Sequence, residues 1–168
     1  MITIQTFSAQ NALIFKAARL CALQDTPSAF CATYAEESQL TDADWIERAT
    51  QANGERSIFY LAMEGDEVRG IAGVLPDPDD ATRVRLVSMW TAPTHRRHGI
   101  GQLLVNKILD WAGRHGIQTL ELHVASDNQS AISFYQWLEF SMTGRTVAYP
   151  SGSAAVVHEM TRPITPGV

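Results

Sequence analysis

The segment from Met89 to Gln102 most constrains how this chain can fold. A strand-like run of alternating apolar residues leads into it, and an amphipathic helical pattern follows it. Arg96, Gly99 and Gly101 lie between the two patterns, in a turn rich in cations and glycine. A strand, a basic glycine-containing turn and a helix N-terminus can together form an anion site from backbone N–H groups. We predict that both glycines can adopt positive φ and let a ligand approach the backbone.

The spacing in this segment excludes two common phosphate-binding loops. A Rossmann turn would need a third glycine three residues after Gly101, where Leu104 stands. A P-loop would need a Gly-Lys pair followed by Ser or Thr, which the segment lacks. The pattern that fits is Arg96-x-x-Gly99-x-Gly101. That pattern is weak alone and gains weight from the strand before it and the leucine-rich helix after it.

Hydrophobic periodicity along the chain predicts a mixed α/β fold. Alternating patterns predict strands over 2–7, 57–63, 67–75, 83–91, 119–124, 141–149 and 154–161. Helical spacing predicts helices over 9–24, 28–39 and 102–114. Two more are predicted from their caps: one begins with a capping box at Thr41 and ends at 53–54, and one begins with a cap at 126–127 and ends at about 138. We expect a turn at 150–152 and a loose tail over 162–168.

Two finer features follow from the same patterns. Strict alternation in the strand 83–91 predicts one shared face for four side chains, those of Val84, Leu86, Ser88 and Trp90. Gly116 is predicted to end the helix 102–114 in a C-cap position.

Length and composition fit a single globular domain. The 168 residues can bury a substantial core, and 45% of them are hydrophobic while 18% are charged. The net charge of −5 argues against a general nucleic-acid binder, although Arg96-Arg97-His98 is a local basic exception. No apolar run approaches the roughly 20 residues of a membrane span, and the N-terminus lacks the pattern of a signal peptide. We therefore expect a cytoplasmic protein without nucleic-acid or membrane partners.

The two cysteines, Cys21 and Cys31, belong to neither a CxxC pair nor a His-containing ligand pattern. We expect them to be reduced, partly buried thiols, and we expect no metal site.

The segment Val84–Phe140 resembles the acetyl-CoA-binding core of the GNAT superfamily of N-acetyltransferases. The family signature [R/Q]-x-x-G-x-[G/A] matches Arg96, Gly99 and Gly101, and a second block follows in the family's order: Asn128-x-x-Ala131-x-x-Phe134-Tyr135-x-x-Leu138-x-Phe140. The resemblance implies one GNAT-like domain over 1–168 with its acetyl-CoA-binding core at about 84–140. It also implies a mostly antiparallel sheet of six or seven strands, splayed at its centre and flanked by helices.

The resemblance assigns a role to each motif. Backbone amides from Arg97 to Gln102 would hold the pyrophosphate of coenzyme A. A backbone N–H near Met89–Thr91 would stabilise the oxyanion, and Asn128 would bind the pantetheine arm. Tyr135 would protonate the leaving thiolate, or would pack as a core aromatic residue. The cofactor-binding residues implied are Met89, Trp90, Thr91, Arg96, Arg97, His98, Gly99, Ile100, Gly101, Gln102, Asn128, Ala131 and Tyr135.

The sequence departs from the family pattern at two positions. Many members place a Glu on the strand before the loop, but residues 85–90 carry no carboxylate. The candidates for a general base are therefore Glu121 and His123 on the next strand, or Glu36 and Glu37, and each could instead be a surface or strand-face residue. Glu139 stands where the family usually has Gly. We expect a different turn there, without loss of activity.

The leading hypothesis is an acetyl-CoA-dependent N-acetyltransferase in which a primary amine attacks the thioester directly through a tetrahedral intermediate. The acceptor would be a small-molecule amine or a peptide or protein amine, and the family resemblance is compatible with a homodimer. The acidic residues Glu36, Glu37, Asp42 and Asp44 would favour cationic amines, or form only a solvated face. The alternatives are a non-catalytic acyl-CoA sensor and an acyltransferase that uses a different acyl-CoA.

Overall fold

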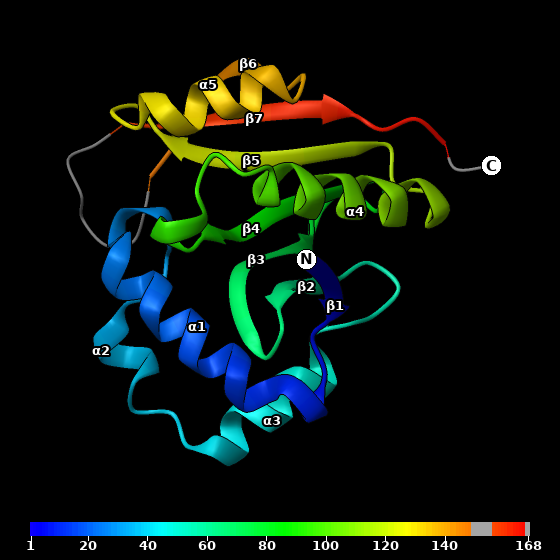
Figure 1. Ribbon diagram of the computed structural model, residues 1–168. Helices are drawn as coiled ribbons and strands as arrows, with labels where there is room; N and C mark the ends of the chain where they lie inside the picture. The colour runs from blue at the N-terminus through cyan, green and yellow to red at the C-terminus, as the bar shows by residue number, and fades with distance from the viewer. Residues whose placement is uncertain (149–155, 167–168) are drawn as a thin grey trace.

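A seven-stranded sheet of order β1-β2-β3-β4-β5-β7-β6 forms the centre of the computed structural model, which describes residues 1–148 and 156–166 (Figure 1). All neighbouring strands pair antiparallel except β4 and β5, which are parallel. The predicted fold class is confirmed. The strands are β1 (Ile2–Thr6), β2 (Ile58–Glu64), β3 (Glu67–Pro76), β4 (Arg83–Thr91), β5 (Thr119–Ala125), β6 (Ser141–Val147) and β7 (Val157–Pro163).

Helices lie on both faces of the sheet (Figure 1). The α-helices are α1 (Ala12–Asp25), α2 (Tyr34–Glu37), α3 (Asp42–Gln51), α4 (Ile100–Arg114) and α5 (Gln129–Trp137). Short 3-10 turns are η1 (Ala9–Asn11), η2 (Pro27–Ala29) and η3 (Pro93–His95).

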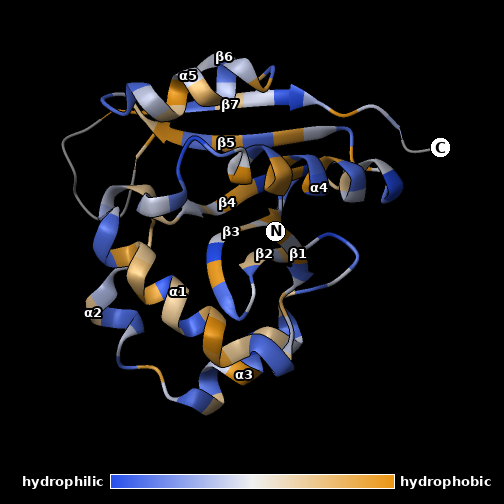
Figure 2. Ribbon diagram, viewed as in Figure 1, coloured by the Kyte–Doolittle hydropathy of each residue, from blue (hydrophilic) through white to orange (hydrophobic). Residues whose placement is uncertain are grey.

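Two hydrophobic clusters hold these layers together. One joins buried residues of α4 and α5, such as Leu104 and Ile132, to the sheet. The other joins Phe15 of α1 and Trp45 of α3 to the opposite side of the sheet. Figure 2 shows hydrophobic and hydrophilic residues interspersed around α1 and α4, as expected of helices with one buried side.

Local sequence signals set the ends of several helices. The predicted capping box begins α3, because Thr41 Oγ1 accepts the Asp44 N–H and Asp44 accepts the Thr41 N–H, at 3.2 and 2.8 Å. Gly116 follows α4 with φ 71°, and the Ile117 N–H donates to the Ala112 carbonyl at 3.1 Å. This hydrogen bond is that of a Schellman motif, so the predicted C-cap glycine is confirmed.

Strand β4 contains a bulge that strict alternation did not predict. Ser88 has φ 58°, and the register to β3 shifts so that Ser88 and Met89 together lie opposite a single β3 residue. An extra residue turns the rest of a strand over. Val84 and Leu86 therefore belong to the cluster beneath α4, whereas Trp90 belongs to the cluster beneath α1. The prediction of one shared face is wrong.

The predicted helix over 28–39 is also wrong. The turn η2 begins at Pro27, Phe30 is extended, and Thr33 starts the single turn α2 with its own capping box to Glu36. Pro27 and the capping box at Thr33 break the segment into pieces that are too short for a continuous helix. Cys21 and Cys31 are both exposed, not partly buried.

The tail is more ordered than expected at its start. Strand β7 continues through Pro163, and the buried Ile164 donates its N–H to the Gln118 carbonyl at 2.9 Å. The prediction of a loose tail is therefore wrong for 162–164. The predicted turn at 150–152 lies outside the described residues.

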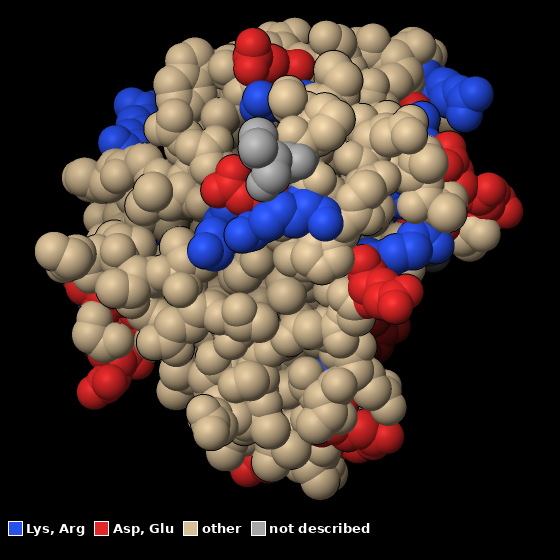
Figure 3. All heavy atoms as spheres, turned by 90° about the vertical axis from the view of Figure 1, so that its right-hand side faces the viewer, with Lys and Arg blue, Asp and Glu red and all other residues tan. Residues whose placement is uncertain are grey.

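Within residues 1–148 and 156–166, no helix combines the length and the apolar character needed to cross a membrane. Figure 3 shows one face of the molecule, on which acidic and basic side chains are scattered over a largely uncharged surface.

Candidate active site

The two central strands part and leave a pocket between them. β4 and β5 pair only at their beginnings, where Arg83, Val84 and Arg85 lie opposite residues 119–121. Past this point a cavity of about 1140 Å³ is lined by both strands, the loop before α4, and parts of α1, α3 and α5. The cavity is large enough for a ligand of more than ordinary drug size.

The loop before α4 has the backbone of an anion site. Arg97 and Gly99 adopt positive φ, 64° and 84°. The first hydrogen bond of α4 runs from the Leu103 N–H to the Gly99 carbonyl at 3.0 Å. The N–H groups of residues 100–102 precede it and are those that an α-helix leaves without an acceptor in its own backbone. The predicted conformation of Gly99 is confirmed, and the helix dipole adds positive potential at this point.

Gly101 has a different role from the one expected. It lies inside α4 and does not adopt positive φ. A Cβ on this residue would lie 2.9 Å from Phe134 Cζ and 3.0 Å from Met89 Cε. A side chain here would displace the ends of the Phe134 and Met89 side chains, so glycine lets these side chains of α5 and β4 pack against the first turn of α4.

The Arg96 side chain ties the loop to α1. Its Nε donates to the Thr91 carbonyl at 3.1 Å, and its Nη2 pairs with the Asp25 carboxylate at the end of α1. Asp25 also accepts the Trp90 Nε1–H at 3.0 Å. Burial acts to raise the pKa of Asp25, but hydrogen bonds from Trp90, Thr26 and Arg96 hold it below its ordinary value. The Arg96 guanidinium thus anchors the loop.

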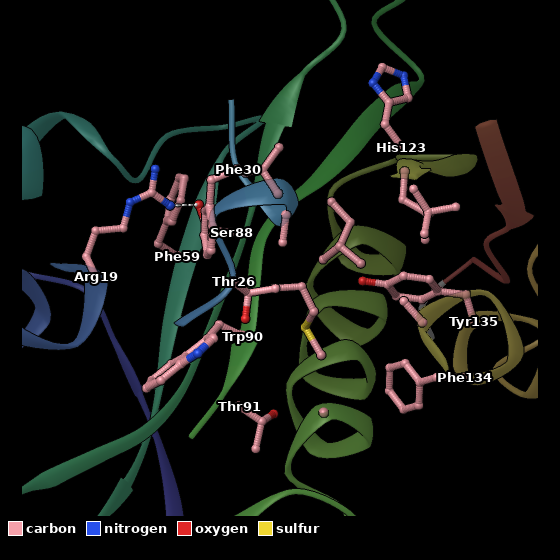
Figure 4. Close-up of a pocket in the computed structure, with 18 of the residues that line it drawn as sticks. Arg19, Thr26, Phe30, Phe59, Ser88, Trp90, Thr91, His123, Phe134 and Tyr135 are labelled. Atoms are coloured by element: carbon pink, nitrogen blue, oxygen red, sulfur yellow. Dashed lines mark hydrogen bonds between the residues drawn. The ribbon is translucent and has the colours of Figure 1, made fainter. Parts of the chain in front are cut away.

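The second motif begins α5. Asn128 Oδ1 accepts the Ala131 N–H at 3.1 Å, so Asn128 is the N-cap, and the predicted cap at 126–127 is wrong. Tyr135 is buried, and its ring packs near those of Phe134 and Phe140, with centroids 5.4 and 5.7 Å away. Figure 4 shows its hydroxyl directed into the pocket. All the predicted cofactor-binding residues line this pocket except His98.

Glu139 keeps the backbone that a glycine would have. Its φ is 69°, and the Phe140 N–H donates to the Tyr135 carbonyl at 3.0 Å while the Glu139 N–H donates to the Gln136 carbonyl at 2.9 Å. These bonds complete a Schellman motif. The expectation of a different turn is wrong, because Glu139 adopts the left-handed conformation despite its Cβ.

The two base candidates on β5 differ in access. Glu121 does not line the pocket and is bound by Arg83 and Arg85, each at 3.1 Å. Burial acts to raise its pKa, but these arginines hold it below the ordinary value. His123 lines the pocket, and its Nε2 lies 3.0 Å from Glu121 Oε1. Burial, together with Arg85, lowers the pKa of His123, so its imidazole is neutral at pH 7.

The candidates from the N-terminal part lie away from the cavity surface. Glu36 belongs to the capping box of Thr33. Glu37 is 4% exposed and pairs with Arg19 and Arg48, at 3.0 and 3.3 Å. Neither glutamate lines the pocket, so neither is positioned as a base.

Sequence reasoning missed the end of the pocket that lies across from Tyr135. Arg19 Nη1 donates to Ser88 Oγ at 2.6 Å, and the guanidinium lies 4.7 Å from the centre of the Phe30 ring. Figure 4 shows Arg19, Phe30 and Ser88 on one side of the pocket and Phe134 and Tyr135 on the other. One signal was available: Arg19 stands midway between the buried Phe15 and Leu23, in the apolar stripe of α1.

The comparisons with known proteins agree with this geometry. Residues 21–140 match the family described as Acetyltransferase (GNAT) family. The chain is 29% identical over 122 residues to the [Ribosomal protein bS18]-alanine N-acetyltransferase of Escherichia coli strain K12, covering 71% of this chain and 80% of that protein. It is 33% identical over 94 residues to human N-acetyltransferase 8, covering 54% of this chain and 41% of that protein. The chain thus spans less than half the length of the latter.

Solved structures show the same fold. A GNAT-family acetyltransferase from Streptococcus pneumoniae superposes with a TM-score of 0.84 at 22% identity, covering 98% of this chain and 99% of that one. The Salmonella typhimurium protein yncA, solved with its cofactor acetyl-CoA, gives a TM-score of 0.81 at 17% identity, covering 100% and 96%. With the signature loop, the splayed strands and the family match in agreement, this chain belongs to the GNAT family of acetyltransferases.

Proposed function

We propose that the protein is an N-acetyltransferase that moves the acetyl group of acetyl-CoA to a primary amine by direct attack through a tetrahedral intermediate. The observation that carries the proposal is the continuity of the pocket. It runs from the N–H groups of the α4 loop, through the gap between β4 and β5, to a second end lined by Arg19 and Phe30. Such a pocket can hold two reactants with their reacting atoms adjacent.

The residues present fit acetyl-CoA. The positive-φ positions at Arg97 and Gly99 and the N-terminus of α4 would hold the pyrophosphate. The bulge at Ser88 and Met89 takes backbone out of the regular β3 ladder, which supports an oxyanion-binding N–H near Met89–Thr91. Asn128 uses its Oδ1 as a helix cap, so its side-chain NH₂ group is the part suited to donate to the pantetheine arm.

Tyr135 would act as the general acid. Its hydroxyl is directed into the pocket near the gap, and a phenol is protonated at neutral pH, so it can donate a proton to the departing thiolate (Figure 4). His123 would take the proton from the amine, directly or through one water. With Nε2–H donated to Glu121, Nδ1 carries the lone pair that accepts this proton.

The test is the release of free thiol from acetyl-CoA in the presence of a panel of primary amines. Tyr135→Phe should lower kcat by about 100-fold, the lower end of what a positioned acid contributes, with little change in acetyl-CoA affinity. The exposed Tyr34 supplies the matched control, Tyr34→Phe, which should behave as the unmodified protein. Tight acetyl-CoA binding with no turnover on any amine would instead favour the sensor.

The same assay decides the acyl group. Propionyl- and butyryl-CoA should be used less efficiently than acetyl-CoA if the acetyl group is the preferred one. A higher kcat/KM with a longer acyl chain would identify an acyltransferase of different specificity.

A further inference from the structure

The end of the pocket that would receive the amine is lined by cations. Arg19, Arg48 and Arg85 contribute to its wall. Among the lining residues that the structure describes, there is no Asp or Glu. The four acidic residues that could favour cationic amines do not line it, namely Glu36, Glu37, Asp42 and Asp44.

The charges close to Arg19 do not cancel. Glu37 is the shared partner of two arginines: its carboxylate accepts from Arg19 Nε and Nη2 at 3.0 and 3.1 Å, and from Arg48 Nη1 at 3.3 Å. One negative charge therefore faces two positive charges, and the triad keeps a net positive charge. The Arg19 side chain is only 13% exposed, so solvent screens its charge weakly.

Arg19 lies beside the place of reaction. Its Nη1 contacts Ser88, which is the bulge residue of β4 in the part of that strand that has left β5. In an α-amino acid a single carbon separates the amine from the carboxylate. Because the Arg19 guanidinium contacts Ser88 at the gap, it can bind the carboxylate while the amine faces the thioester.

A cation at this point also discriminates between amines. It disfavours a neighbouring ammonium and so lowers the pKa of the bound amine, which increases the fraction of the reactive free base. A second ammonium on the same substrate would be repelled. The aromatic walls formed by Phe30, Phe59 and Trp90 suit an apolar or aromatic side chain.

We propose that the acceptor is a primary amine with a carboxylate close to it, that is, an amino acid with an apolar or aromatic side chain. Arg19 binds the carboxylate, and the aromatic residues hold the side chain. This substrate class rests on the proposed acetyltransferase function and narrows it.

Three matched amines test the class: L-phenylalanine, L-phenylalaninamide and phenethylamine. Thiol release from acetyl-CoA should show a kcat/KM for phenylalanine at least tenfold above those for the other two. An equal or higher kcat/KM for the amide or for phenethylamine would overturn the proposal. So would an equal or higher kcat/KM for spermidine, a polyamine without a carboxylate.

The double variant R19Q/E37Q tests the assigned residue. It removes Arg19 together with the carboxylate that pairs with it, so no unpaired buried carboxylate is left behind. The half-exposed Arg48 remains and keeps the net charge of the group unchanged, so the variant tests the position of the Arg19 guanidinium. The ratio of kcat/KM for phenylalanine to that for its amide should fall to about one, and a normal thermal unfolding transition verifies folding. The control is Lys16→Gln, because Lys16 lies on the same helix in a partly exposed pair with Asp42. A ratio unchanged in R19Q/E37Q overturns the assignment.

A binding measurement separates failure of this inference from failure of the enzyme. N-acetyl-L-phenylalanine and its amide are titrated into the protein saturated with coenzyme A. Preferential binding of the free acid by tenfold or more supports the inference, and equal binding of the two overturns it, whichever amines turn over. Absence of turnover with every amine would contradict the proposed function alone.

Discussion

The two ends of the pocket are built in different ways. The proposed cofactor end uses backbone groups, two glycines and one short motif within residues 89–102, and a second motif on the adjacent helix α5. The proposed acceptor end uses side chains that come from α1, the loop after η2, β2 and β4, with Arg19, Phe30, Phe59 and Ser88 as members. The proposed base His123, on β5, lies apart from them on the side of Tyr135 (Figure 4). A site built from backbone groups leaves a fixed spacing in the sequence, because few residue types are tolerated at its positions. A site built from side chains of several distant elements leaves almost no recognisable spacing.

The largest expected effect breaks the cofactor end. Gly101→Val places a branched side chain where a Cβ alone would lie 2.9 Å from Phe134. Overpacking of this kind costs about 1–3 kcal/mol of stability. If the strain is relieved by moving the loop out of its ligand-binding geometry, the same energy corresponds to roughly 5- to 150-fold in affinity. We expect weaker acetyl-CoA binding by calorimetry, with the same loss for every amine partner. Lys107→Val, on the exposed side of the same helix, controls for helix propensity. An unchanged Kd would contradict the packing role of Gly101.

A second glycine substitution breaks the acceptor end instead. A Cβ at Gly73 would lie 2.2 Å from Phe59 Cδ1, so Gly73→Ala forces the Phe59 ring to move. We expect the KM of the amine to rise roughly fivefold, for a cost of about 1 kcal/mol. The acetyl-CoA Kd should be unchanged. The control is Gly54→Ala, where the added Cβ meets only an ordinary contact at 3.4 Å. A change in acetyl-CoA binding as large as that in KM would show that the two ends are not separable.

The pH dependence of kcat/KM tests His123, which acts on the amine and not on acetyl-CoA in the proposed mechanism. Burial and Arg85 hold the pKa of His123 below its ordinary value of 6.5, while Glu121 and Glu159 oppose the shift. If neutral His123 is the base, the profile of kcat/KM has an acidic limb at that lowered pKa, in addition to the limb set by the pKa of the amine itself. Arg85→Gln removes one cause of the shift, so the acidic limb should move to higher pH. Arg83 still faces the carboxylates in this variant.

Arg114→Gln, at the far end of α4, is the control and should leave the acidic limb in place. The limb should disappear in His123→Gln, and its persistence there would assign it to another group. The stability of the folded protein should also decline as the pH falls through this range. The unfolded chain protonates His123 more readily than the folded one does, so His123 subtracts stability as the pH falls below about 6.5.

The smallest effect is one on stability without a change in catalysis. Glu139 adopts φ 69°, where a residue with a Cβ costs roughly 1–2 kcal/mol and glycine does not. Its pair with Arg162 is exposed and offsets little of this. Glu139→Gly should raise the unfolding temperature by about 2–8 °C, at about 2–4 °C per kcal/mol. Gln136→Gly, within the same helix, should lower it. A lower unfolding temperature for Glu139→Gly would mean that the Arg162 pair matters more than the backbone conformation.

The sequence predicted the parts of the fold that depend on local patterns. Alternation and helical spacing give the seven strands and α1, α3, α4 and α5, and the capping residues Thr41 and Gly116 act as expected. The bulge in β4 could not be predicted in this way. Alternation of apolar residues continues through Ser88 and Trp90 in the sequence, and only pairing with β3 reveals the extra residue. Tertiary pairing, not local preference, decides this point.

The candidate site shows the same division. The spacing of Gly99, Gly101 and Asn128 indicated the cofactor end because backbone conformation and close packing restrict those positions. The spacing could not show that two arginines bind Glu121 whereas His123 lines the pocket. The two residues lie on one strand, and their environments depend on the strands beside it. Arg19 meets Ser88 across 69 positions of sequence, a separation at which periodicity carries no information.

The short pairing of β4 with β5 also affects the behaviour of the chain before any ligand arrives. An ordinary open sheet has two edges, which are β1 and β6 among the described strands. Because β4 and β5 pair over only three residues of the described chain, they leave two further edges inside the molecule. Open edges are templates for another strand and hence for aggregation. The twist introduced by the Ser88 bulge makes β4 a poorer template. A bound extended ligand in the gap would cover both inner edges, so we expect a ligand that fills the gap to reduce aggregation of the protein.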